Sequence, residues 1–84
     1  MSDASIAARI ERLVNEEHEL RKREERDSED AGALEQDAKR LREVEVDLDR
    51  CWDLLRQRRA LRAAGADPDQ ASVRDADTVE HYEQ

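Results

Sequence analysis

The sequence predicts an all-α protein in which two long helices form an antiparallel, coiled-coil-like hairpin. Charged residues make up 45% of the 84 residues, with only 2 glycines and 1 proline, and this composition is typical of long charged helices. The few apolar residues recur at helical spacing along each predicted helix. Because the chain has no Phe and one Trp, its core must be small. We therefore expect two hairpins to associate into a four-helix bundle.

The first helix is predicted at about residues 3–27. Apolar residues spaced by four, three and seven positions form one stripe along it: Ile6, Ile10, Leu13 and Leu20. Ser2 or Asp3 suits the N-cap position. This helix therefore presents a single narrow apolar face to a partner.

The turn is predicted at about residues 28–32. The stretch "DSEDAG" at residues 27–32 is small and acidic, and it is the only internal break in the helical pattern. It contains no proline, so one continuous helix of roughly 60 residues remains the alternative.

The second helix is predicted at about residues 33–64, where leucine recurs every seven residues: Leu34, Leu41, Leu48 and Leu55. Val44 and Cys51 add positions three residues after a leucine, as in a heptad seam. Gly65 suits the position just after the helix, and Pro68 prevents its continuation.

Folding the two helices together pairs residues whose numbers sum to about 61, and apolar residues then meet at each level. The pairs are Leu20 with Leu41, Leu13 with Leu48, Ile10 with Cys51 and Trp52, and Ile6 with Leu55. Residues 65–84 form an acidic tail that we expect to be extended or mobile. Within it, Asp67 and Pro68 favour one short helical turn.

Residues 48–64 carry five basic and two acidic side chains, a net charge of +3 in a chain of net charge −8. Arg59 and Arg62 continue the leucine seam beyond the start of the first helix, so we expect them at an exposed helix end. Leu54 and Leu61 form a second stripe that the hairpin does not cover. Either the tail, through Val73, Val79 and Tyr82, or a second copy of the chain would cover it.

The candidate partner surface consists of Trp52, Leu54, Leu61, Arg58, Arg59 and Arg62.

No pattern in the sequence indicates catalysis, a cofactor or a metal site. "NEEHELR" at residues 15–21 has Asn15 where a di-iron bundle needs Glu, and Lys22 where a zinc protease needs His. Cys51 falls within the seam, where a buried, inert thiol is expected. We therefore expect a protein that is not an enzyme.

The predicted function is a small protein-interaction or structural module that acts through helix surfaces, with a homodimer and an unknown protein as partners. The alternative is an accessory factor of a ribonucleoprotein or transcription complex that uses the Arg56–Arg62 cluster. The acidic net charge argues against general affinity for nucleic acid. No apolar run is long enough to span a membrane, and the N-terminus does not look like a secretory signal, so we expect a cytoplasmic protein.

Three segments carry a resemblance to a known family: "EEHELR" at residues 16–21, "LDRCWDLLRQRRALR" at residues 48–62, and "GADP" at residues 65–68. Together with "VEHY" at residues 79–82, they resemble a family of short, uncharacterised actinobacterial proteins, a domain of unknown function. The resemblance covers most of the chain. It implies a cytoplasmic bacterial setting and no particular activity.

Overall fold

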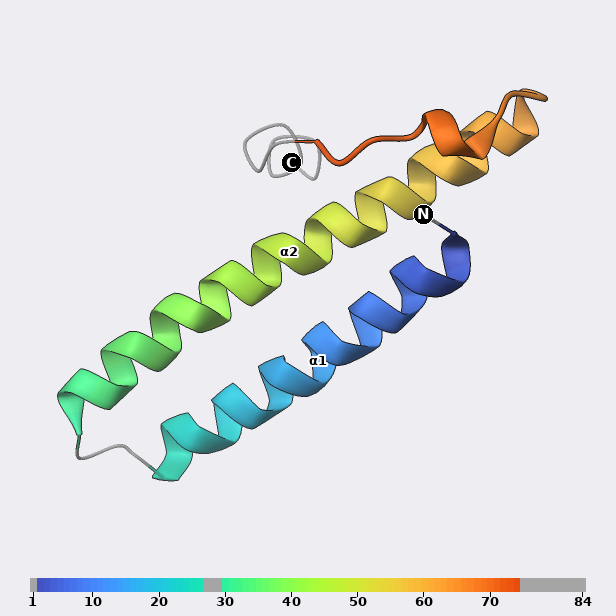
Figure 1. Ribbon diagram of the computed structural model, residues 1–84. Coiled ribbons are helices and arrows are strands. Elements are labelled where there is room, and N and C mark those ends of the chain that lie inside the picture. Colours follow the sequence, from blue (N-terminus) through green and yellow to red (C-terminus); the bar gives the residue numbers. More distant parts are fainter. Residues whose placement is uncertain (1, 27–29, 75–84) are drawn as a thin grey trace.

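The structure, a computed structural model, describes residues 2–26 and 30–74. Helices α1 (Asp3–Arg26) and α2 (Ala31–Ala63) run antiparallel, and a short 3-10 helix, η1 (Pro68–Gln70), folds back beside the end of α2 (Figure 1). No strand occurs within the described ranges. The predicted helical hairpin is therefore confirmed, and the alternative of one unbroken helix is wrong.

Helix α1 begins with a reciprocal pair of serine hydrogen bonds. Ser2 Oγ accepts from the backbone N–H of Ser5 at 3.1 Å, and the backbone N–H of Ser2 donates to Ser5 Oγ at 3.0 Å. Two backbone donors are satisfied in this way, as in a capping box. Of the two predicted cap residues, Ser2 is therefore the one that caps α1.

Helix α2 begins at Ala31, two residues before the predicted start, because Asp30 caps it. The Asp30 carboxylate accepts from the backbone N–H of Ala33 at 3.0 Å. At the other end Gly65 has φ of +75°, and the N–H groups of Gly65 and Ala66 bond back to the carbonyls of Arg62 and Leu61. These two bonds form a Schellman motif, which ends the helix where the sequence predicted.

A Gly65→Ala variant is expected to lose about 1 kcal/mol of unfolding free energy, because an alanine at positive φ is strained. A Cβ at this position would meet no atom within 4 Å, so the loss is purely conformational. Thermal unfolding followed by circular dichroism measures it. Gly32→Ala is the matched control: Gly32 lies in the first turn of α2 without a positive φ, and alanine there should keep or raise stability. Equal losses in both variants would contradict this role of Gly65.

The core is one apolar cluster along the contact between α1 and α2: Ile6, Ile10, Leu13, Leu20, Leu41, Val44, Leu48, Cys51 and Leu54. Ion pairs between the helices show the alignment of the chain. Arg58 pairs with Asp3 and Arg23 pairs with Asp37, and the residue numbers of these partners sum to 61 and 60. The observed register therefore agrees with the predicted sum of about 61.

Two residues near the end of the seam differ from the predicted pairing. Leu55 is only partly buried, whereas its neighbour Leu54 is 5% exposed. Leu54 is buried because residues 66–74 return along its side of the helix, where Val73 lines the same cavity, whereas Leu55 lies about 100° around the helix at the edge of the core. Trp52 lies about 100° around the helix from Cys51, which faces the core, so Trp52 does not lie against Ile10 but is 50% exposed.

The C-terminal segment packs on α2 as far as it is described. Asp67 caps η1 by accepting from the N–H of Asp69 at 2.9 Å, with Pro68 at the first helical position, as the sequence predicted. Ala71 packs against the core, and Val73 lies near Leu54. Residues 66–74 are thus not a free tail, and they cover the Leu54 stripe. Val79 and Tyr82, the other two residues expected to dock there, lie outside the described residues.

Candidate functional site

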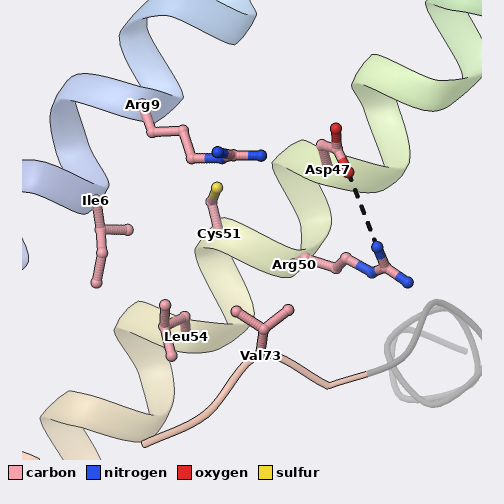
Figure 2. A pocket seen from close by; sticks show the side chains of 7 residues that line it. All are labelled: Ile6, Arg9, Asp47, Arg50, Cys51, Leu54 and Val73. Atoms are coloured by element: carbon pink, nitrogen blue, oxygen red, sulfur yellow. Dashed lines mark ion pairs between the residues drawn. The ribbon is translucent and has the colours of Figure 1, made fainter. Parts of the chain in front are cut away.

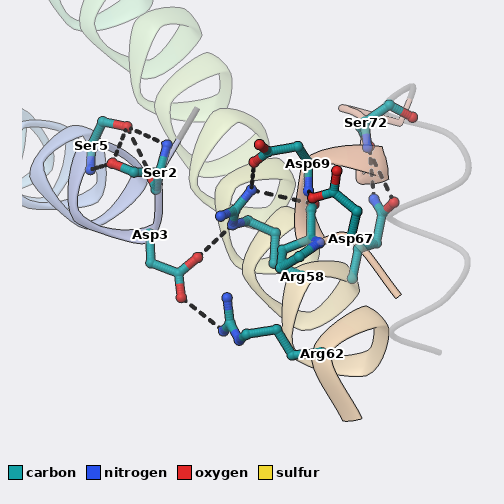
Figure 3. A network of polar contacts seen from close by, with 10 residues as sticks. Ser2, Asp3, Ser5, Arg58, Arg62, Asp67, Asp69 and Ser72 are labelled. Atoms are coloured by element: carbon teal, nitrogen blue, oxygen red, sulfur yellow. Dashed lines mark hydrogen bonds and ion pairs between the residues drawn. The ribbon is translucent and has the colours of Figure 1, made fainter. Parts of the chain in front are cut away.

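Arg58 joins three separate parts of the chain (Figure 3). Its Nε donates to the carboxylate of Asp3 at the start of α1. Its Nη1 donates to the carbonyl oxygen of Pro68 at 3.2 Å and to Asp69 Oδ1 at 3.0 Å. The residue is only 9% exposed. Arg58 was predicted to be part of a partner surface, and it is instead an internal connection between α1, α2 and η1.

Asp3 also binds Arg62, whose Nη2 lies 2.8 Å from Asp3 Oδ2. These bonds, to Arg62 first and then to Arg58, hold the pKa of Asp3 below its ordinary value of 3.8. The hydrogen bonds of Arg58 to Asp3 first, and to Asp69 second, raise the pKa of Arg58. Two arginines of the Arg56–Arg62 cluster are therefore occupied by carboxylates of the same chain.

A second set of contacts holds the C-terminal segment against α2. Gln57 Nε2 donates to the carbonyl of Ser72 at 2.7 Å, and the N–H of Ser72 donates to Gln57 Oε1 at 3.3 Å. Gln57 Nε2 also donates to Asp53, whose carboxylate is nearly inaccessible and lies 3.6 Å from Arg74 Nε. The sequence analysis did not single out Asp53 or Gln57. Their i,i+4 spacing on a polar face of α2 resembles that of ordinary surface residues.

A cavity of about 190 Å³ lies between α1, α2 and the C-terminal segment (Figure 2). Its wall consists of Ile6, Arg9, Asp47, Arg50, Cys51, Leu54 and Val73. The Cys51 thiol is buried, as predicted, and Arg50 Nη1 lies 3.9 Å from Asp47 Oδ1. No group of three potential metal ligands occurs within residues 2–26 and 30–74. The cavity thus brings together apolar side chains, two arginines and one aspartate.

The six residues predicted as a partner surface do not form one continuous surface. Leu54 and Arg58 are buried, and Leu61 is partly buried. Trp52 and Arg59 are exposed, and Arg62 is exposed apart from its contact with Asp3. Burial by the C-terminal segment explains the difference, because the segment occupies the stripe that the hairpin alone leaves open.

Trp52 lies on the other flank of α2. At 100° per residue, its side chain is about 160° around the helix from that of Leu54, which the C-terminal segment covers. Trp52 and Val73 are the two large apolar side chains that are exposed among the described residues. On the Trp52 flank, Arg21 of α1 donates to Glu45 Oε1 at 3.1 Å. The exposed indole therefore stands beside charged side chains on a flank that no described segment covers.

These features define a small helical-hairpin protein whose C-terminal segment returns along its second helix. The chain belongs to the family described as "Protein of unknown function (DUF2630)", which matches residues 2–84. It is 48% identical over 82 residues to the uncharacterized protein Rv0898c of Mycobacterium tuberculosis and to the uncharacterized protein Mb0922c of Mycobacterium bovis. Each alignment covers 96% of this chain and 90% of the relative.

The predicted resemblance to uncharacterised actinobacterial proteins is therefore confirmed. No solved structure is significantly similar to the chain. Within the described residues, neither α1 nor α2 has an apolar stretch that could cross a bilayer.

Proposed function

We propose that the protein is a non-enzymatic interaction module that binds a protein partner through the flank of α2 centred on Trp52. The observation that supports this is the 50% exposure of Trp52 on a flank left open by the C-terminal segment. Tryptophan is among the residue types that contribute most to binding at protein interfaces.

Side-chain contacts between the helices on both sides of Trp52 add to this argument. Arg58 ties α1 to the end of α2, and Arg40 of α2 binds Glu16 of α1 through two bonds, at 2.6 and 2.9 Å. Trp52 lies between these two connections along α2. A side chain on a rigid helix loses little conformational entropy on binding, which favours affinity.

A Trp52→Ser variant is expected to lose at least about 10-fold in affinity for the partner while keeping the fold, because half of the indole already faces water. The measurement is retention of partner proteins from native lysate on the immobilised chain, followed by titration of the retained protein. Since Trp52 is the only tryptophan, its emission should also shift to shorter wavelength when the partner covers it.

Val73→Ser is the matched control, because Val73 is the other exposed large apolar residue and lies near Leu54, on the side away from Trp52. It should retain the partner as the unmodified chain does. If the Trp52→Ser variant retains the same proteins with the same affinity, the proposed surface is wrong.

A further inference from the structure

The flank of α2 around Trp52 carries charges of opposite sign at equal distances on its two sides. Glu45 lies seven residues before Trp52, and Arg59 lies seven residues after it. Seven residues rotate an α-helix by 700°, which is 20° short of two full turns, so the three side chains form one row. The helical rise places each charge about 10 Å from Trp52 along the axis. From the N-terminal to the C-terminal side, the row therefore consists of a negative, an aromatic and a positive side chain.

All three side chains of this row are accessible. Trp52 is 50% exposed, the Glu45 side chain is 46% exposed, and Arg59 is exposed. Glu45 is held in place by Arg21, which donates to it at 3.1 Å. The same order of charges recurs closer to Trp52, with Asp49 three residues before it and Arg56 four residues after it. The row is thus a presented surface and not part of the hairpin core.

Two copies of this row have complementary charges when they pack antiparallel to each other. In a two-fold interface, residue i of one copy meets residue j of the other, and j meets i. A two-fold axis at Trp52 places Glu45 of each copy opposite Arg59 of the other, with the two indole rings at the centre. A parallel arrangement would instead place like charges opposite each other, which is unfavourable.

We propose that the partner on this flank is a second copy of the chain, packed with its α2 antiparallel around a two-fold axis at Trp52. The proposal rests on the proposed function, since it names the occupant of the same surface. The dimer is a four-helix bundle in which the two α2 helices lie in the centre of the interface and the C-terminal segments lie away from it. Leu54, which is buried within each hairpin, takes no part in the interface.

The test is a charge exchange followed by sedimentation equilibrium of the full chain. The unmodified chain should be a dimer. Glu45→Arg and Arg59→Glu should each weaken dimerisation by about 10-fold or more, because each places like charges opposite each other twice. An equimolar mixture of the two variants should recover a heterodimer, because the substituted positions then face opposite charges.

The double variant Glu45→Arg/Arg59→Glu should dimerise with itself, and Arg42→Glu is the matched control for an exposed charge reversal on α2 outside the row. Circular dichroism checks that each variant keeps its helices, since Glu45→Arg also removes the Arg21 contact.

If the unmodified chain is monomeric at high micromolar concentration, the dimer is wrong. The proposed function is tested separately, by whether Trp52→Ser loses the protein partner. A dimer that neither single variant weakens, or single variants that do not recover on mixing, would overturn the two-fold arrangement at Trp52.

Discussion

Leu54→Ala is expected to lower the free energy of unfolding by about 2–4 kcal/mol, because it removes a buried side chain beside an existing cavity. Leu54 is 5% exposed and lines the cavity together with Ile6 and Val73. The surrounding groups come from α1, α2 and the C-terminal segment, so they cannot all move in to fill the space. A chain of this size has a total stability of about 4–12 kcal/mol, so the loss is a large fraction of it.

Leu55→Ala is the matched control, because it makes the same chemical change one position along the same helix. Leu55 is partly buried and packs at the edge of the core, so its loss should be about 1 kcal/mol. Urea unfolding followed by circular dichroism compares the two variants. The opposite ranking would mean that the regular heptad seam continues to Leu55 and that the C-terminal segment does not cover Leu54.

Arg23→Ala is expected to cost about 2 kcal/mol, because it leaves a buried carboxylate without its partner. The Asp37 side chain is 5% exposed and accepts two bonds from the Arg23 guanidinium, one of them from Nε at 3.3 Å. Arg23 itself is about half exposed, so water partly replaces the lost bonds. For this reason the expected cost lies below that of a fully enclosed ion pair.

Removing the carboxylate of Asp37 should cost less stability than removing its partner Arg23, so the two single variants can be compared directly. Asp37→Ala leaves Arg23 free to turn into water, and adding Asp37→Ala to Arg23→Ala should recover part of the lost stability. Arg26→Ala is the control for the loss of a positive charge from the last turn of α1, and it should cost less than about 0.5 kcal/mol. The same measurement by urea unfolding serves all four chains. Additive losses from Arg23→Ala and Asp37→Ala would show that Asp37 does not depend on Arg23.

The positions of Asp37 and Arg58 explain why part of the site could not be predicted. Both occupy the series of positions that also contains Val44 and Cys51, at seven-residue spacing along α2. By sequence, Arg58 looks like a basic residue at an exposed helix end. It is buried because Asp3, which is 55 residues away in the sequence, and Asp69 both reach it. The spacing of apolar residues along the helices does not predict such contacts between separate segments.

The sequence by itself did not predict the Asp30 cap of α2, but it determined the two helices, the end of α2 at Gly65, the register of their antiparallel pairing and the short turn at Pro68. These features depend on local preferences and on the period of the apolar residues, both of which are readable along the chain. Only the tertiary structure decided that Leu54 is covered in place of Leu55, and that Arg58 connects three segments. It also left the Trp52 flank of α2 open. The physical reason is that burial on a two-helix hairpin depends on the side to which the C-terminal segment returns, and that choice is made by contacts between residues far apart in the sequence.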